Sequence, residues 1–188
     1  WKYYGDEEEP KLHTGWFEAV PSKELNSDDH ENGTTHWYYA NSKGEITIPT
    51  ADGEVGVAKT IDGKSYLFNS DGEMVTGLRI LTYDGSKITN ISSEVDTADT
   101  VKNMNSDTMK LVYFESNGAA KTGTTTITLD GTSYTFSFKS NGSPRGVGET
   151  GISDGYIYQN GLRLTADEDT KYGVVTYKNE SYVVNEKG

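Results

Sequence analysis

The side chains best suited to ligand binding are the aromatic residues of a repeated sequence motif, which we call the aromatic motif. In each copy, aromatic residues are followed by a short polar turn that ends in glycine, as in Tyr66-Leu67-Phe68-Asn69-Ser70-Asp71-Gly72. Further copies end at Gly44, Gly118, Gly142 and Gly188, and a looser one ends at Gly161. Exposed aromatic rings stack on the C–H faces of sugars, and their π electrons attract cations. The pattern therefore predicts recognition of a ligand by ring faces.

The triplet Trp37-Tyr38-Tyr39 is the strongest binding candidate among these residues. Successive side chains of a strand point to opposite faces, so at least one of the three rings should lie outside the core. For any single tyrosine the alternative to ligand binding is a buried position, because aromatic rings on short strands form the core of so thin a protein. We predict ligand binding by six residues: Trp16, Trp37, Tyr38, Tyr39, Tyr66 and Tyr113.

One serine motif matches a pattern used in catalysis. Gly151-Ile152-Ser153-Asp154-Gly155 has the spacing of a nucleophile elbow, which needs a strand before the serine and a helix after it. Asp154-Gly155 is instead a hairpin signal, so a turn is the better interpretation. The histidines, at 13, 30 and 36, all precede the serine, whereas that hydrolase order puts histidine last. No catalytic residue is predicted, and the chain is expected not to be an enzyme.

Two acidic clusters have part of the pattern of a calcium loop. Asp28-Asp29-His30-Glu31-Asn32-Gly33 places His30 and Tyr39 where an EF-hand needs Asp or Asn and then Glu. Asp167-Glu168-Asp169 lacks the glycine. Both are predicted to be solvated loops, with a weak calcium site of another type as the alternative. The histidines have no metal-ligand spacing, so neither a metal nor a cofactor is expected.

Paired turn residues indicate how the backbone folds. Asp62-Gly63, Asp130-Gly131 and Asp154-Gly155 are strong signals for two-residue hairpin turns, which need positive φ at both positions. Asp84-Gly85 and Asn179-Glu180 take equivalent places. Only 33% of the residues are hydrophobic, which suits thin units that bury a few rings against a neighbour. We predict an all-β fold, an elongated β-hairpin solenoid of stacked short repeats.

The repeat spacing also predicts the domain organisation. We expect a single repeat array over residues 1–188, with a divergent N-terminal repeat at 1–58 and repeats at 59–80 and 109–188. The long step between Gly72 and Gly118 indicates an insertion at 81–108. Any helix should be short and confined to this insertion, within Ser93–Asn105, and Ser22–Thr35 should be a polar loop. Because the chain stops inside a repeat, we expect a fragment of a longer protein.

The charge of the chain excludes some partners. A net charge of −12 repels phosphate backbones and anionic membrane surfaces, so nucleic acid is not an expected partner. No apolar run approaches the length of a membrane span, so membrane insertion is not expected. Cysteine is absent, which fits a cytosolic protein or a bacterial secreted protein without disulfides.

The repeat units resemble the cell-wall-binding repeat family. Residues 60–77 carry the closest match, and Thr14-Gly15-Trp16 followed by Trp37-Tyr38-Tyr39 is similar to another copy. The family includes choline-binding modules, the glucan-binding repeats of streptococcal glucosyltransferases and the C-terminal repeats of clostridial toxins. The resemblance covers most of the chain except Arg79–Ser106 and implies a solenoid of β-hairpins.

The resemblance also implies a kind of site. In choline-binding members the tryptophan after Thr-Gly is a wall of an aromatic cage for a quaternary ammonium group. Here that position holds Trp16, then Leu78 and Thr124 in later copies. A regular series of choline sites is therefore not expected, and one cage near Trp16, Trp37 and Tyr39 is the remaining candidate.

Three functions are compatible with these features. The first is a non-catalytic module that binds cell-wall polysaccharide, teichoic acid or another glycan and anchors a secreted bacterial protein, outside the cell, to its surface. The second is an adhesin or toxin-type segment that recognises host glycans. The third is a structural spacer without a ligand.

Overall fold

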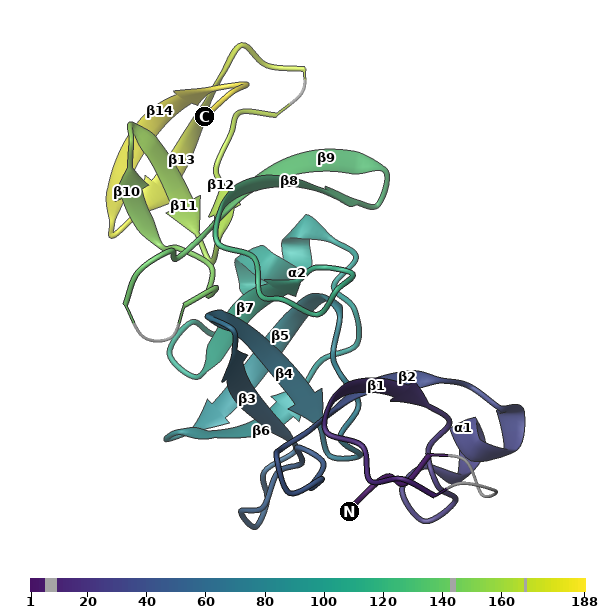
Figure 1. The fold of residues 1–188 in the computed structure, drawn as a ribbon. Helices are drawn as coiled ribbons and strands as arrows, with labels where there is room; N and C mark the ends of the chain where they lie inside the picture. Colours follow the sequence, from purple (N-terminus) through teal and green to yellow (C-terminus); the bar gives the residue numbers. More distant parts are fainter. Residues whose placement is uncertain (6–9, 143–144, 168) are drawn as a thin grey trace. The chain divides into compact units, whose positions relative to one another are not determined.

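The computed structural model describes residues 1–5, 10–142, 145–167 and 169–188, and in these residues the fold is all-β (Figure 1). This confirms the predicted all-β class, while the solenoid arrangement stays a prediction. The strand pairings given below are antiparallel. The strands are β1 (Gly15–Ala19), β2 (His36–Ala40), β3 (Gly56–Ile61), β4 (Lys64–Asn69), β5 (Gly77–Asp84), β6 (Lys87–Ile91), β7 (Met109–Phe114), β8 (Gly123–Leu129), β9 (Thr132–Phe138), β10 (Gly151–Ser153), β11 (Tyr156–Gln159), β12 (Leu162–Arg163), β13 (Tyr172–Tyr177) and β14 (Glu180–Asn185).

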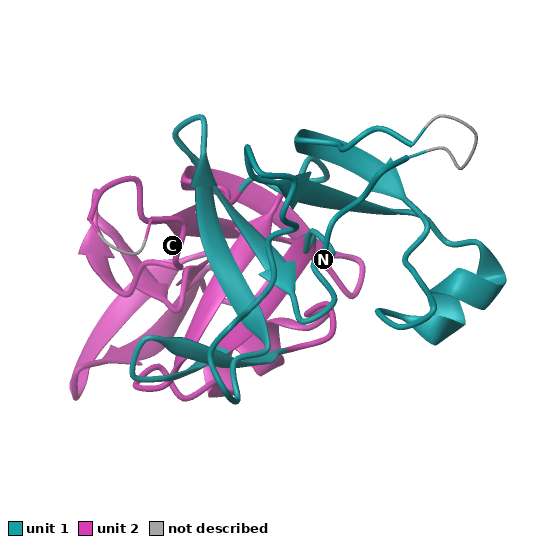
Figure 2. Ribbon diagram, turned by 60° about the horizontal axis from the view of Figure 1, so that its bottom comes forward, with its two compact units in different colours: residues 1–76, 82–91, 116–119 teal, residues 77–81, 92–115, 120–188 magenta. Residues whose placement is uncertain are grey.

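The chain divides into two compact units (Figure 2). Unit 1 comprises residues 1–76, 82–91 and 116–119, and unit 2 comprises residues 77–81, 92–115 and 120–188. In unit 1, β1 pairs with β2, and β3 pairs with both β4 and β6. In unit 2, a five-stranded sheet has the order β10-β11-β12-β9-β8, and β13 pairs with β14. The single repeat array over 1–188 stays a prediction.

The predicted hairpin turns lie where the sequence places them. Asp62-Gly63 joins β3 to β4, Asp130-Gly131 joins β8 to β9, and Asp154-Gly155 joins β10 to β11. The three aspartates have φ of 49°, 46° and 50°, and each glycine after them is also positive, as a type I′ turn requires. Local turn chemistry thus sets the register of these hairpins.

Two further turns are shifted by one residue from the prediction. Tyr177 pairs directly with Glu180, so the turn is Lys178-Asn179, with φ of 50° and 63°, and not Asn179-Glu180. Asp84 is still part of β5, so the loop before β6 is Gly85-Ser86 and not Asp84-Gly85. In both hairpins strand pairing fixes the turn position more strongly than the preference of one aspartate or asparagine does.

An asparagine organises the polar turn at the end of the aromatic motif. The side-chain oxygen of Asn69 accepts hydrogen bonds from the backbone N–H groups of Asp71 (3.0 Å) and Glu73 (2.9 Å), and its amide donates to Glu73 Oε2 (2.9 Å). Asn41 makes the same three kinds of contact with Lys43 and Glu45. Such bonds from a side chain to its own turn stabilise a tight change of direction.

After each turn the chain returns and pairs with the strand it has just left. The backbone N–H of Thr47 donates to Tyr39 O, that of Val75 to Leu67 O, and that of Lys121 to Tyr113 O. A second bond reaches the strand of the preceding repeat. Met74 N donates to Trp37 O in unit 1, and Gly148 N donates to Leu111 O in unit 2, each at 2.8 Å. We call the first kind of bond, within one copy, the closing hydrogen bond and the second kind, between copies, the stacking hydrogen bond. Copies in both units make these two kinds of bond.

Small aromatic and aliphatic clusters form the cores of both units. Phe136 and Phe138 stack with their ring centroids 6.1 Å apart in unit 2, where Leu111 and Leu162 are also fully buried. In unit 1, Phe17 packs against Tyr38 beneath the β1–β2 pair. Full burial of one such side chain contributes roughly 1.5–3 kcal/mol.

Two short helices accompany the strands. Helix α2 (Ala98–Asn103) lies inside Ser93–Asn105, as predicted, and buries Ala98 and Val101. Helix α1 (Ser27–Asn32) lies in the segment expected to be a polar loop, so the confinement of helix to the insertion is wrong. Its first turn is capped by the Asn26 side chain, which accepts from Asp29 N, and Gly33 ends it at φ 66°. Since α1 buries no residue, it has no apolar periodicity that could reveal it.

Gly72 and Gly63 provide a matched test of the turn geometry. Both have strongly positive φ (80° and 76°), but a Cβ on Gly72 would meet Ile46 Cγ2 at 2.9 Å, whereas one on Gly63 would meet nothing within 4 Å. We expect Gly72→Ala to destabilise the protein by about 2–4 kcal/mol and Gly63→Ala by about 1 kcal/mol, because only the first adds overpacking to backbone strain. Urea unfolding of both variants measures the difference, and equal losses would contradict it.

Candidate functional site

Four of the six predicted binding residues lie on or beside one face of the β1–β2 pair. In the antiparallel register Trp16 is opposite Tyr39, and Glu18 is opposite Trp37. Because alternate residues of a strand share a face, these four side chains lie on the same side of the sheet. Tyr66, on β4, packs against Trp16 from the neighbouring hairpin. We call Trp16, Trp37, Tyr39 and Tyr66 the aromatic face.

The rings of the aromatic face form an edge-to-face corner. The Trp16 ring centroid lies 5.1 Å from that of Tyr39 and 4.8 Å from that of Tyr66, with interplanar angles of 70° and 62°. The fully buried Phe68 packs against Trp16 at 5.8 Å. Trp16, Tyr39 and Tyr66 are half-buried, while 46% of Trp37 is exposed. The corner thus combines a packed base with rings that solvent reaches.

Polar groups flank these rings. The Lys59 ammonium, on β3, lies 5.6 Å from the Tyr39 ring centroid. The exposed Glu18 carboxylate accepts a hydrogen bond from the Thr35 hydroxyl at 2.8 Å. Ring faces next to a carboxylate and an ammonium can stack on a sugar and exchange hydrogen bonds with its hydroxyls. Sequence reasoning missed Glu18 and Lys59, although Glu18 alternates with Trp16 along the same strand.

Tyr38 is a core residue and not part of the aromatic face. It is opposite Phe17 in the register, on the other side of the sheet, and only 2% of it is exposed. Its ring stacks on that of Phe17 at 5.5 Å. Burial, together with the nearby charge of Glu73, raises the pKa of its hydroxyl. The prediction that Tyr38 binds a ligand through its ring is therefore corrected, whereas the prediction of an exposed ring in the triplet is confirmed by Trp37.

Tyr113 lies in unit 2 and packs against the core of that unit, with its ring centroid 6.4 Å from that of Phe138. The positions that match Trp16 in later copies differ as well. Leu78 is buried in the core of unit 2, and Thr124 is an exposed residue of β8. These copies therefore lack the tryptophan that the cage of the resembled family requires.

Unit 2 contains an aromatic corner that already holds a cation. Tyr156 and Tyr158 meet edge to face at 6.5 Å, and the Arg163 guanidinium lies 3.7 Å from the Tyr156 ring centroid. Arg163 also donates to the Tyr158 hydroxyl at 3.1 Å. Tyr156 and Arg163 border an open groove of about 1090 Å³, lined also by Tyr134 and Lys187. The arginine occupies the place that an external cation would take.

The structure places the serine motif in a turn and the first acidic cluster on a helix. Ser153 ends β10 and precedes the Asp154-Gly155 turn and a strand, as the turn interpretation predicts. Asp28, Asp29 and Glu31 lie on α1. The Asn26 amide donates to both Asp29 and Glu73, and so links Asp29 to the turn at Asn69–Glu73. Glu168, at the centre of the second acidic cluster, falls outside the described residues.

Comparisons with known proteins find likeness only at the level of solved structures. No family model matches the chain, and no curated protein matches it. The similar structures include CbpF in complex with ipratropium (20% identity, TM-score 0.29), which is covered over 53% of its length by the whole of this chain. CbpJ from Streptococcus pneumoniae TIGR4 (19%, TM-score 0.26) is covered over 48% of its length by 95% of this chain.

Truncated alternansucrase from Leuconostoc mesenteroides NRRL B-1355 is also similar, at 17% identity and a TM-score of 0.34, with 95% of this chain covering 13% of that protein. The chain thus spans about half the length of CbpF and CbpJ. At these TM-scores the likeness establishes no shared function. Among the described residues no helix combines the length and the apolar character that a membrane crossing requires.

The two tryptophans of the aromatic face should differ in their effect on stability. We expect Trp16→Ala to cost about 2–4 kcal/mol, because this ring packs against Tyr39, Tyr66 and Phe68. Trp37→Ala should cost less than about 1 kcal/mol, because nearly half of this ring is in solvent. Chemical denaturation of both variants tests this. A larger loss for Trp37→Ala would place that ring in the core.

Proposed function

We propose that this chain is a non-catalytic carbohydrate-binding module that holds a secreted bacterial protein on cell-wall polysaccharide, teichoic acid or another glycan, outside the cell. The aromatic face carries the proposal. Its rings come from two neighbouring hairpins and remain partly accessible, although three of them pack against one another. A surface of this kind suits a ligand with apolar faces and hydroxyl edges, which is the chemistry of a sugar.

The charges on and around the aromatic face favour a neutral sugar over choline. A quaternary ammonium stacked on Tyr39 would approach the Lys59 ammonium, which lies 5.6 Å from that ring centroid. Like charges this close disfavour each other. The same ammonium and the Glu18 carboxylate can instead hydrogen-bond to sugar hydroxyls. With a net charge of −12, nucleic acid and anionic membranes are not proposed as partners.

We further propose that the repeats form a regular hairpin solenoid. The closing and stacking hydrogen bonds support this, since the acceptors of the stacking bonds, Trp37 O in one unit and Leu111 O in the other, each lie seven residues before the glycine that ends their copy, 44−37 and 118−111. A regular array would present several weak sites to one polymer and gain affinity through multivalency. No enzymatic step is proposed, because the motif at Ser153 is a hairpin turn.

Two other functions are separated from this one by experiment. A segment that recognises host glycans would use the same ring chemistry, so only the identity of the bound glycan distinguishes it. A structural spacer would bind neither cell walls nor glycan arrays.

Trp37→Ala is the decisive variant for the proposed site. Binding of the chain to purified cell-wall polysaccharide, measured by titration and by pull-down, should weaken by about fivefold or more, the equivalent of 1 kcal/mol at an exposed anchor. Tyr172→Ala is the matched control, because Tyr172 is 59% exposed but lies on β13 in unit 2. It should bind like the unmodified chain.

The outcomes separate the hypotheses. If folded Trp37→Ala binds as tightly as the unmodified chain, the aromatic face is not the site. If free choline elutes the unmodified chain from walls that bear teichoic acid, the choline interpretation replaces the one based on sugars. Binding to host glycans but not to walls supports the adhesin or toxin-type function, and no binding to either supports the spacer.

A further inference from the structure

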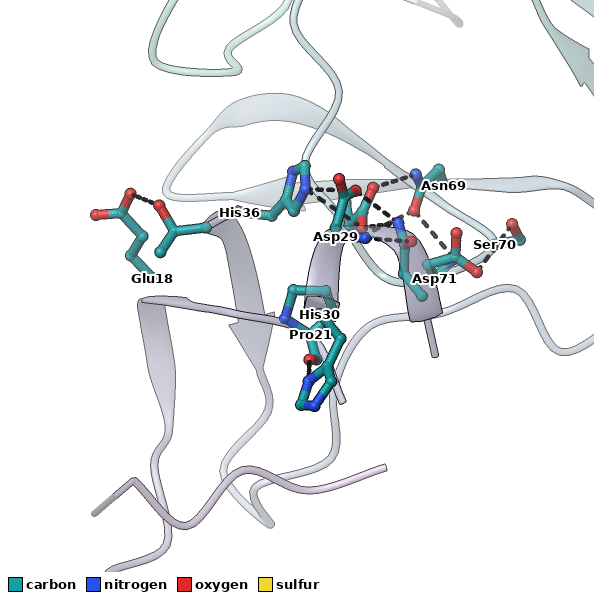
Figure 3. A network of polar contacts seen from close by, with 11 residues as sticks. Glu18, Pro21, Asp29, His30, His36, Asn69, Ser70 and Asp71 are labelled. Atoms are coloured by element: carbon teal, nitrogen blue, oxygen red, sulfur yellow. Dashed lines mark hydrogen bonds and ion pairs between the residues drawn. The ribbon is translucent and has the colours of Figure 1, made fainter. Parts of the chain in front are cut away.

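One histidine and two carboxylates converge in unit 1, on the side of the β1–β2 pair that faces away from the aromatic face. His36 Nε2 lies 2.9 Å from Asp29 Oδ2 and 3.6 Å from Glu73 Oε1, and the three atoms lie within 4.8 Å of one another. Figure 3 shows His36 directed at Asp29, whereas His30 points away to the carbonyl of Pro21. The cluster joins α1 and the start of β2, which are close in sequence, to the distant turn after β4.

Two asparagine amides hold the carboxylates in place. Asn26 Nδ2 donates to Asp29 Oδ2 at 2.7 Å and to Glu73 Oε1 at 3.0 Å. Asn69 Nδ2 donates to Glu73 Oε2 at 2.9 Å. Only 8% of Glu73 is exposed, so its position is fixed by these contacts and by the surrounding turn. Both carboxylate ligands are thus oriented by hydrogen bonds from neighbouring amides, as in protein metal sites.

Tyr38 provides an independent observation at the same place. Its side chain lies on the same face of β2 as that of His36, two residues earlier. Only 2% of Tyr38 is exposed to solvent. Its hydroxyl has no hydrogen-bond partner among the described residues. The turn that carries Glu73 lies against this part of β2, because the backbone N–H of the next residue, Met74, donates to Trp37 O at 2.8 Å. A buried hydroxyl normally has a partner, and a metal-bound water or a metal-bound carboxylate would provide one here.

The electrostatics of the cluster favour a cation. The Asp71 carboxyl lies in the same turn, two residues before Glu73. The His36 imidazole thus contacts two carboxylates, those of Asp29 and Glu73, and asparagine amides are further neutral contacts of these carboxylates. A divalent ion would offset the repulsion among these carboxylates.

We propose that Asp29, His36 and Glu73 form a binding site for a divalent transition-metal ion of the Zn²⁺ type. An imidazole nitrogen with two carboxylate oxygens is a ligand set that Zn²⁺ accepts, whereas Ca²⁺ and Mg²⁺ select oxygen ligands. Tetrahedral Zn²⁺ at about 2.0–2.1 Å from each ligand separates the ligand atoms by about 3.3 Å, close to the separations of His36 Nε2 from the two carboxylate oxygens. Three protein ligands leave a fourth position for water near the Tyr38 hydroxyl.

The metal would link the segment between β1 and β2 to the turn of the next repeat. Asp29 belongs to α1, which buries no residue, and Glu73 belongs to the Asn69 turn. The ion would therefore help to order a helix that has no buried residue to hold it in place. This inference is independent of the glycan-binding proposal.

Titration of Zn²⁺ into the 188-residue chain, stripped of metal with EDTA and dialysed, tests the site. We expect one equivalent to bind and the thermal unfolding temperature to rise with Zn²⁺ concentration. His36→Gln should weaken Zn²⁺ binding by more than about tenfold, since even changes to groups behind the ligands weaken metal affinity by about 10–100-fold. His30→Gln is the matched control: it removes a histidine of α1 whose Nδ1 contacts the Pro21 carbonyl at 2.8 Å, away from the cluster, and Zn²⁺ binding should be unchanged.

Asp29→Asn is a second ligand variant, and it keeps an oxygen acceptor for His36 in case His36→Gln does not fold. Loss of Zn²⁺ binding in the folded ligand variants, with retention in His30→Gln, supports the site. Absence of Zn²⁺ binding by the unmodified chain overturns it, as does equal binding by the unmodified chain and a folded ligand variant. Binding of Ca²⁺ as tight as that of Zn²⁺ would also overturn it, because the imidazole would then contribute nothing.

Discussion

The return of the chain from each polar turn onto its own strand is the interaction on which the rest of this structure depends. The hydrogen bonds from Thr47 N to Tyr39 O and from Val75 N to Leu67 O close the first two copies, and the bond from Lys121 N to Tyr113 O closes the third. A chain with few apolar residues cannot bury enough surface to position strands by packing alone. It must instead satisfy its backbone groups locally, and the side-chain contacts of Asn41 and Asn69 make that return possible.

Strand register then divides the aromatic residues between two roles. In β2, Tyr38 points to the core, and its neighbours Trp37 and Tyr39 point to the opposite face. A shift of one residue would exchange these roles and bury the tryptophan in place of the tyrosine. The closed turn therefore determines which rings stabilise the fold and which remain accessible. The same alternation places His36 with Tyr38, so the polar cluster and the aromatic face occupy opposite sides of one strand pair.

Features that depend on neighbouring residues could be predicted from the sequence. The Asp-Gly turns at 62–63, 130–131 and 154–155 follow from backbone preferences, and so does the all-β class. Features set by distant contacts could not. Tyr38 and Tyr39 look equivalent until the register with Phe17 is known, and Glu73 has no sequence relation to His36. The Lys178-Asn179 turn shows the same limit, because pairing of Tyr177 with Glu180 determines its position.

The lack of buried residues in helix α1 affects how easily this segment unfolds locally. It is held by a capping asparagine, a left-handed glycine and polar side-chain contacts, and it buries none of its residues. Opening it would expose almost no apolar surface, so its free energy of local unfolding should be far below that of the β1–β2 pair it connects. Amide hydrogens of residues 27–32 would then exchange with solvent through a local fluctuation, while those of Phe17 and Tyr38 would exchange only when the unit opens. The segment can thus move on its own timescale without disturbing the rings of the aromatic face.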